Sequence, residues 1–191
     1  MKIKNMVMKD KKHKHLGGNL ENGDPDTFSE KVWKYLLEIT NANKILDLGS
    51  GRGYTSKWFI DHGLTVTAVD GLEQNISTAI VPTILHDLTT GPYLNSVDLV
   101  ICVEVVEHIE EIFLENLLNS LSNGNYIFMT HAVPGQTGYH HVNCQNSEYW
   151  INHLANKNFK LLETESNKLR ELAKEDNARW LVQNGMIFQR I

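Results

Sequence analysis

The run ILDLGSGRG, residues 45–53, decides the fold. An apolar segment with one acidic side chain ends in three glycines spaced two apart, and a helix-like segment follows at residues 54–60. This pattern predicts a buried parallel strand, a tight turn and a crossover helix. The glycines permit positive φ angles and let a ligand approach bare backbone. The amide groups that open the helix would face that ligand as a weakly positive surface.

The spacing within the turn indicates which ligand it holds. A dinucleotide fingerprint reads G-x-G-x-x-G/A, but the sixth position here is Tyr54 and the third glycine comes one residue early, at Gly53. The carboxylate of Asp47 would repel a pyrophosphate and suits an ammonium group. The D-x-G-x-G-x-G pattern resembles motif I of the class I S-adenosylmethionine-dependent methyltransferases, in which the amino-acid end of the cofactor lies over this turn. Taken alone, the motif also fits a glycine-rich turn of another α/β domain.

Length and composition are those of an ordinary globular domain. The chain has 191 residues, of which 21% are charged and 41% hydrophobic. A net charge of -5 argues against broad affinity for nucleic acid. The basic cluster at residues 9–15 is more typical of a solvated, mobile tail than of a phosphate-binding arm. Two cysteines form no disulfide framework, no apolar run approaches a membrane span, and Met1–Lys4 opens no signal peptide. We therefore expect a cytoplasmic protein with no membrane partner.

Two segments of different character divide the chain. Residues 1–26 carry turn-forming residues and charge, and they form an N-terminal segment that is either mobile or folded over the cofactor. Residues 27–191 are predicted to form a single methyltransferase domain, beginning with a helix at 28–40 capped by Asp26 or Thr27.

Strands alternate with helices through most of this domain, which predicts parallel βαβ units. After the first strand, further strands are expected at 64–69, 83–86, 97–102, 125–130, 159–162 and 186–190. Helices are expected at 54–62, 73–79, 111–121, 147–157 and 166–183. The resemblance implies that the last strand inserts antiparallel. The predicted fold is therefore a Rossmann-like, doubly wound, mainly parallel seven-stranded sheet with its last strand antiparallel and helices on both faces.

The cofactor site is predicted from the ends of successive strands. Asp70 follows the glycine turn by about 20 positions and is placed to accept hydrogen bonds from ribose hydroxyls, although Asp70-Gly71 could be a simple turn. The resemblance implies that Asp87 accepts from the adenine amine and that Leu88 packs on the ring. The predicted cofactor-binding residues are Asp47, Gly49, Ser50, Gly51, Gly53, Asp70, Gly71, Asp87, Leu88, Cys102 and His108.

Candidate catalytic residues lie after the fifth strand. The sulfonium of the cofactor is an activated donor, so the protein mainly aligns the acceptor and supplies a base where a proton must leave. His131 directly follows that strand, at the edge where open α/β sheets bind ligands. Tyr139, His140 and His141 lie in the long loop at 131–146, which could close over the acceptor. We predict these four as catalytic, against the alternative of structural or surface histidines.

A metal site is a second possibility. On a helix start, Glu104, Glu107 and His108 would share one face, and His140 or His141 could complete a divalent-metal site. Some methyltransferases, including small-RNA and quinone-ring enzymes, use a matching Glu-x-x-Glu-His in this way, and many relatives carry the same letters without metal. The predicted site accordingly includes no metal.

The resemblance covers roughly residues 44–191 and implies a methyltransferase that uses S-adenosylmethionine and releases S-adenosylhomocysteine. We expect methyl transfer to O or N of a small molecule or sugar, with nucleic acid a less favoured partner. The alternatives are a metal-assisted methyltransferase of the RNA 2′-O type, a catalytically inactive cofactor-binding regulatory module, and a nicotinamide dehydrogenase. Tyr54 disfavours the dehydrogenase.

Overall fold

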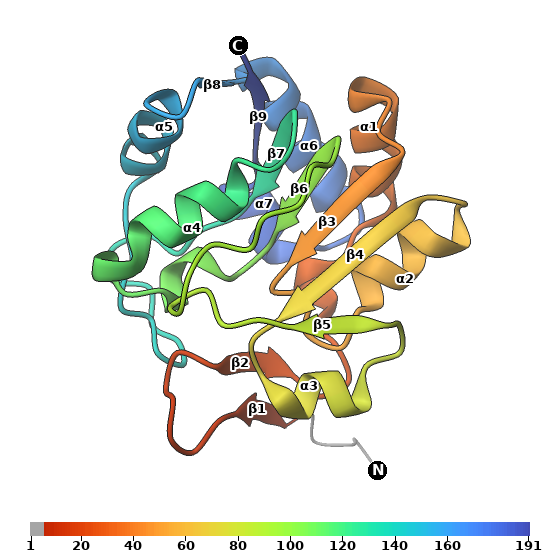
Figure 1. Ribbon diagram of the computed structural model, residues 1–191. Helices are drawn as coiled ribbons and strands as arrows, with labels where there is room; N and C mark the ends of the chain where they lie inside the picture. Colours follow the sequence, from red (N-terminus) through yellow and green to blue (C-terminus); the bar gives the residue numbers. More distant parts are fainter. Residues whose placement is uncertain (1–5) are drawn as a thin grey trace.

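A seven-stranded sheet forms the centre of the computed structural model, which describes residues 6–191 (Figure 1). Across the sheet the strands are β5 (Thr83–Leu85), β4 (Thr65–Asp70), β3 (Lys44–Leu48), β6 (Leu99–Cys102), β7 (Tyr126–Met129), β9 (Met186–Arg190) and β8 (Phe159–Leu161). Neighbours from β5 to β7 pair in parallel, whereas β9 is antiparallel to both β7 and β8. The predicted mainly parallel sheet with an antiparallel last strand is confirmed.

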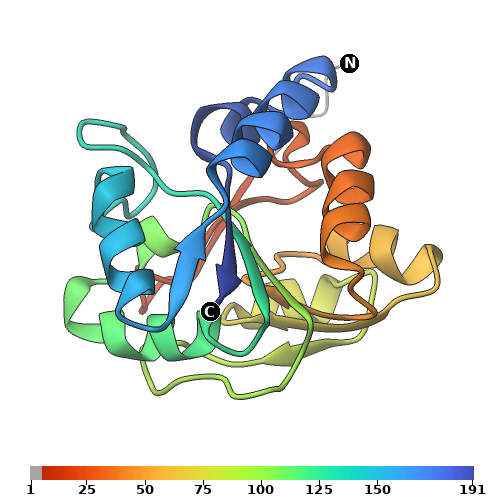
Figure 2. The same cartoon turned by 90° about the horizontal axis from the view of Figure 1, so that it is seen from above.

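Helices cover both faces of the sheet (Figure 2). They are α1 (Glu30–Thr40), α2 (Tyr54–Asp61), α3 (Glu73–Thr78), α4 (Leu114–Leu121), α5 (Ser147–Ala155), α6 (Glu163–Glu175) and α7 (Arg179–Asn184). Three short 3₁₀ turns are η1 (Pro25–Thr27), η2 (Val106–His108) and η3 (Glu111–Phe113).

Alternation along the buried strands divides the core into two layers. In β6, Leu99 and Ile101 pack with α1, α2, α6 and α7, whereas Val100 and Cys102 pack with α4 and α5. Successive side chains of a strand point to opposite faces, so a strand that is apolar at every position needs helices on both sides.

The carboxyl ends of the parallel strands lie at one edge of the sheet. Asp47 of β3 pairs in register with Ala68 of β4 and with Ile101 of β6. The segments that follow these strands therefore emerge together, at the edge where open α/β sheets bind ligands.

An N-terminal hairpin lies beside this edge (Figure 1). Its strands β1 (Val7–Lys9) and β2 (Gly17–Leu20) are antiparallel, and the side chain of Met8 is buried. Part of the predicted 1–26 segment, residues 1–5, lies outside the described residues, as does the start examined for a signal peptide. In residues 6–191, no helix has the length and apolar character needed to span a membrane.

Two predicted helix boundaries are wrong. α1 begins at Glu30 with Ser29 as its cap, not Asp26 or Thr27, because the Ser29 hydroxyl accepts from Val32 N (3.2 Å) while residues 25–27 form η1. The predicted helix at 166–183 is two helices, α6 and α7, separated where Asn177 takes a left-handed φ of 58°.

Candidate active site

A cavity of about 750 Å³ lies at the carboxyl edge of the sheet. Its walls come from the turn after β3, the ends of β4 and β6, the segment after β5, the N-terminal hairpin and the loop after β7. Elements far apart in the sequence thus enclose one space. The N-terminal hairpin, residues 7–20, covers one side of it, and we call this hairpin the roof.

The glycine turn supplies one wall. Gly49, Gly51 and Gly53 all have positive φ, at 77°, 56° and 84°, a region that strains other residues. Gly49 also lacks room for a side chain, since a Cβ there would lie 2.3 Å from a Val105 methyl carbon. Beneath the turn, the buried Asp47 carboxylate accepts from the Ser56 hydroxyl (2.6 Å). Burial raises the pKa of Asp47 to about 6.

Asp70 links the end of β4 to the glycine turn through hydrogen bonds. One carboxylate oxygen accepts from Gly51 N (2.8 Å), and the other accepts from Leu72 N and Asn75 Nδ2 (both 2.9 Å). Burial raises the pKa of Asp70. The Asn75 amide in turn exchanges hydrogen bonds of 3.1 Å with the amide of Asn19 in the roof. Asp70 therefore holds the glycine turn in shape as well as lining the cavity.

Asp87 stands at the opposite wall, after β5. One of its carboxylate oxygens accepts from His15 Nε2 (2.9 Å), and the other accepts from the backbone and hydroxyl of Thr89. Burial alone would raise the pKa of Asp87, but the hydrogen bonds from His15 and Thr89 hold that pKa below its usual value. Leu88 is buried next to it and also lines the cavity.

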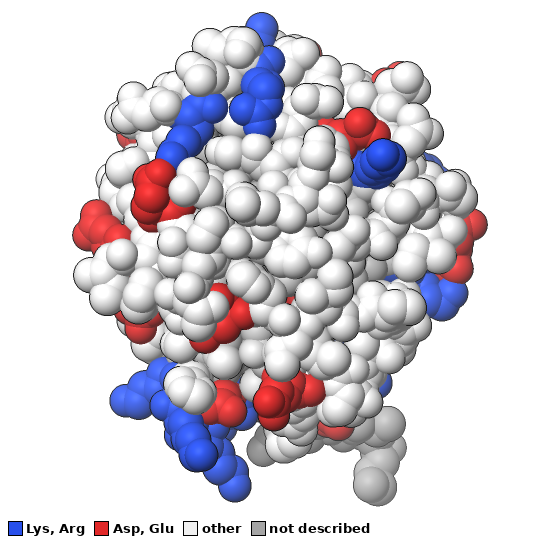
Figure 3. Space-filling model, viewed as in Figure 1, with Lys and Arg blue, Asp and Glu red and all other residues white. Residues whose placement is uncertain are grey.

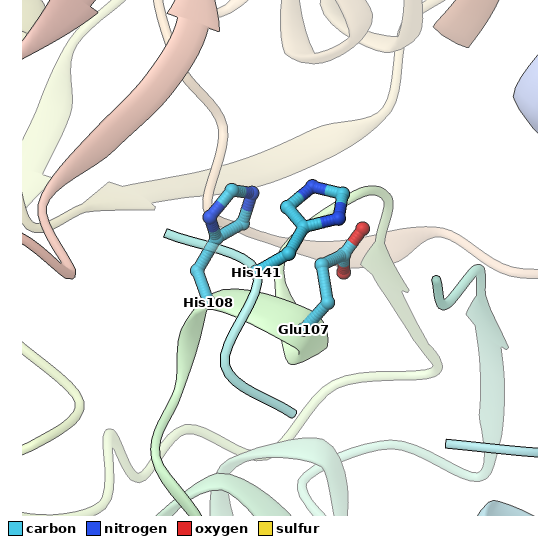
Figure 4. Close-up of side chains that lie close together, drawn as sticks. All are labelled: Glu107, His108 and His141. Carbon is cyan, nitrogen blue, oxygen red and sulfur yellow. The ribbon is translucent and has the colours of Figure 1, made fainter. Parts of the chain in front are cut away.

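Glu107, His108 and His141 form a cluster in which one ligand atom of each lies within 4.8 Å of the others (Figure 4). Glu107 is fully buried, and its oxygens make no hydrogen bond of normal geometry among the described residues; they interact with the Glu107 backbone and the Glu104 carboxyl. His108 Nδ1 is unpartnered among the same residues. Burial, and then the neighbouring charge of Glu104, raise the pKa of Glu107. Burial lowers the pKa of His108 to about 4, so this imidazole is neutral near pH 7.

This donor set fits a divalent cation. A carboxylate oxygen and two neutral imidazoles suit a transition-type divalent ion, and such an ion would satisfy buried polar atoms that are otherwise costly. The helix face predicted for Glu104, Glu107 and His108 is wrong, because Glu104 has a left-handed φ of 55° and only η2 follows it. Glu104 instead accepts from the Thr130 hydroxyl (2.9 Å), although it also lines the cavity.

The comparisons relate part of the chain to methyltransferases. Residues 46–129 match the family described as "Methyltransferase domain". A structure described as a SAM-dependent methyltransferase from Archaeoglobus fulgidus superposes with a TM-score of 0.59 at 17% identity, covering 88% of this chain and 96% of that one. The SAM-bound magnesium protoporphyrin IX methyltransferase of Synechocystis gives 0.60 at 14% identity, covering 84% and 76%. Residues 46–129 therefore match a methyltransferase domain, and the fold is that of S-adenosylmethionine-dependent methyltransferases.

Curated relatives of this chain include two named ubiquinone biosynthesis O-methyltransferase. That of Rickettsia typhi is 36% identical over an alignment of 114 residues, and the match covers 53% of this chain and 46% of the relative. That of Rickettsia felis is 33% identical over 114 residues, again 53% and 46%. The chain thus spans about half the length of the curated relatives it matches.

Most of the predicted cofactor residues line the cavity, but Gly53 and Cys102 do not. Gly53 is the cap of α2, where a Cβ would lie 2.5 Å from a Val81 methyl carbon, so it permits close packing of that helix. Cys102 points to the α4 and α5 side of the sheet, while its neighbours Ile101 and Val103 face the cavity. Successive side chains of a strand point to opposite faces, which explains why Cys102 lies away from the cavity, contrary to the prediction.

The four predicted catalytic residues are not brought together. His141 and Tyr139 line the cavity. His131 is fully buried away from the cavity walls, with its ring nitrogens 3.0 Å from the Ser147 hydroxyl and 3.3 Å from the Ala132 carbonyl oxygen. His140 pairs through Nε2 with Glu110 (3.0 Å) and is also absent from the lining. The predicted placement of His131 and His140 at the site is therefore corrected. Both lie outside the cavity lining and form hydrogen bonds with neighbouring segments.

The roof supplies residues that the sequence did not single out. His15 contacts Asp87, Asn19 contacts Asn75, and Gly18 lies so close to His108 that a Cβ there would be 2.9 Å from its ring. Gly18 has a φ of 104°, which favours glycine. The turn-forming residues at 16–19 indicated irregular backbone. The contacts of the roof with Asp87, Asn75 and His108 could not be predicted, because these residues are far from it in the sequence and no local pattern relates them.

Cofactor affinity should fall in mild acid because of Asp47. An ammonium group needs the ionised carboxylate, so lowering the pH from 7.5 to 5, through a pKa of about 6, should weaken S-adenosylhomocysteine binding by about tenfold. In the free protein the linkage has the opposite sign: the folded pKa exceeds the usual value of 3.8, so the stability contribution of Asp47 is present at low pH and is lost as pH rises through about 6.

Calorimetric titration from pH 5 to pH 8 measures the cofactor effect. Asp47→Asn serves as the matched variant, because it should bind weakly at every pH and lack this step. An identical pH profile in wild type and variant would contradict the assignment.

Proposed function

We propose that this protein transfers the methyl group of S-adenosylmethionine to a hydroxyl oxygen of a small molecule, with a divalent cation held by Glu107, His108 and His141. The observation that carries the proposal is the buried Glu107 carboxylate, which makes no hydrogen bond of normal geometry with the described residues, beside two imidazoles at the wall of the cofactor cavity. The curated relatives are named O-methyltransferase, which supports the choice of oxygen.

The cofactor would be held at three points of the cavity. Asp47 would accept from its ammonium group, Asp70 would lie at the ribose, and Asp87 with Leu88 would hold the adenine. All four line the same space, so the cofactor would run from the glycine turn to the segment after β5. Its sulfonium would then lie between these ends, on the side of Glu104 and His108.

The acceptor hydroxyl must lose its proton as the methyl group arrives. A bound cation would stabilise the negative charge that develops on the acceptor oxygen. His141 is oriented for ligation, because Nδ1 lies 3.3 Å from the Gln136 carbonyl oxygen and donates to it, which leaves the lone pair on Nε2. Burial raises the pKa of Glu104, which brings this cavity carboxylate closer to the range of a proton acceptor. The roof and the loop after β7 would exclude water from the transfer.

Methyl transfer from radiolabelled S-adenosylmethionine to a panel of catechol, aniline and a short RNA oligonucleotide tests the proposal. Phenolic hydroxyls have a pKa near 10. A cation beside the oxygen and a carboxylate that accepts the proton could therefore promote their deprotonation. We expect label on a catechol oxygen with manganese present, and at least about a hundredfold loss on adding chelator. S-adenosylhomocysteine affinity should stay within about twofold. Label only on aniline or RNA, or turnover indifferent to chelator, would count against the proposal.

A further inference from the structure

Four lysines gather on the loop that joins β1 and β2. Lys9, Lys11, Lys12 and Lys14 are all exposed, and Figure 3 shows lysine and arginine side chains clustered at the edge of the molecule where this hairpin lies. None of the four forms an ion pair with a carboxylate in residues 6–191. Residues 9–14, which we call the lysine loop, therefore carry four lysines and one carboxylate, Asp10, and so a local excess of positive charge on a chain of net charge -5.

The lysine loop is folded, in contrast to the mobile tail that its composition suggested. The Asp10 carboxylate accepts from the backbone N–H groups of Lys12 (2.6 Å) and His13 (2.7 Å), and Asp10 N donates to Leu16 O (2.9 Å). The acidic residue of the loop is thus occupied with the backbone. A preorganised loop loses less conformational entropy on binding a ligand than a mobile tail does.

The same loop is tied to the cavity. His15 and Leu16, the next residues, line it, and His15 bonds to Asp87. His15 is also an electrostatic neighbour of Glu110, which pairs with His140 in the loop after β7. In Figure 1 the turn of the hairpin lies at the same edge as the chain between β7 and α5. The lysine loop therefore borders the side of the cavity where His141 and Tyr139 lie.

We propose that the acceptor carries a phosphate-type anionic group and that the lysine loop binds it. This inference rests on the proposed function, in which the acceptor hydroxyl lies near Glu107 and His141. Lysine ammonium groups are point-charge ligands for phosphate, and four unpaired lysines repel one another until an anion lies among them. Figure 3 shows carboxylates on the surface next to the cluster, so a long polyanion would meet repulsion where a single phosphate group would not.

The decisive experiment compares hydroxytyrosol, a catechol with an uncharged alcohol side chain, with its phosphate monoester. In low salt, the phosphate should lower KM by about tenfold or more in the wild type. Lys11→Gln/Lys12→Gln/Lys14→Gln should lose that gain and keep the wild-type KM for hydroxytyrosol. Lys160→Gln/Lys168→Gln/Lys174→Gln, a matched set of exposed lysines on β8 and α6, should keep the gain. Turnover of both acceptors with equal KM would overturn the inference and leave the proposed function standing.

A binding measurement separates the two proposals. Calorimetric titration of the S-adenosylhomocysteine complex with inorganic pyrophosphate should show binding that the loop variant loses and the control variant keeps. With that binding and no turnover of either acceptor, the proposed function fails while anion binding by the loop is supported. If pyrophosphate does not bind, but an RNA oligonucleotide or vesicles of phosphatidylcholine with phosphatidylglycerol bind through these lysines, the partner is a macromolecule or a membrane surface and the inference is overturned.

Discussion

Replacing Glu107 with glutamine should reduce methyl transfer by about 10²- to 10³-fold while S-adenosylhomocysteine affinity stays within about twofold. Glutamine keeps the shape of the side chain but offers only a neutral amide to a cation. The fold should tolerate the change, because the pKa of the buried Glu107 is raised and its oxygens make no hydrogen bond of normal geometry with the described residues. A neutral amide avoids the cost of burying an unpaired charge, so the melting temperature should be unchanged or higher.

The measurement is turnover with catechol across a range of manganese concentrations. Wild type should respond to the cation, and Glu107→Gln should respond little at any concentration. Glu148→Gln, an exposed glutamate on α5, is the matched control and should behave as wild type. A Glu107→Gln protein that melts several degrees lower and keeps wild-type turnover per folded molecule would make Glu107 a structural residue.

Local pattern accounts for what the sequence predicted correctly. The apolar run of β3 followed by glycines has few alternatives, because Gly49 must take positive φ and lacks space for a side chain beside Val105. Likewise, the parallel pairing of most strands was predicted from the alternation of strands and helices. The placement of Asp47 and Asp70 at the cavity followed from the ends of β3 and β4, without knowledge of tertiary contacts.

Some site residues were mispredicted because the sequence does not show in which direction their side chains point. His131 and Cys102 were expected at the site because they end or follow strands, but each points to a packed layer instead. A strand end fixes where a backbone emerges, and the face its side chain takes depends on the register of one residue. The pairs His15–Asp87 and Asn19–Asn75 join segments that no sequence period relates, so the roof became visible only in the structure.

Replacing Asp70 with alanine should weaken S-adenosylhomocysteine binding by at least about a hundredfold and also lower the stability of the free protein. Three N–H donors, from Gly51, Leu72 and Asn75, would lose their acceptor in a buried place. Each unsatisfied buried donor costs about 1–3 kcal/mol, unless water enters. The glycine turn would then no longer be tied to β4, and the proposed ribose acceptor would be gone.

Two variants separate the binding role of Asp70 from its structural role. Asn75→Ala removes one of the three donors and leaves the Asp70 carboxylate in place, so it should lower the melting temperature with a much smaller loss of affinity. Asp70→Asn keeps the volume and one acceptor oxygen, and it should be more stable than Asp70→Ala but still bind weakly, because a ribose diol needs more acceptor capacity than one amide oxygen offers. Calorimetric affinity corrected for the folded fraction gives the comparison. If the corrected affinity of Asp70→Asn equals that of the wild type, Asp70 only supports the turn, and the ribose hydroxyls bind elsewhere.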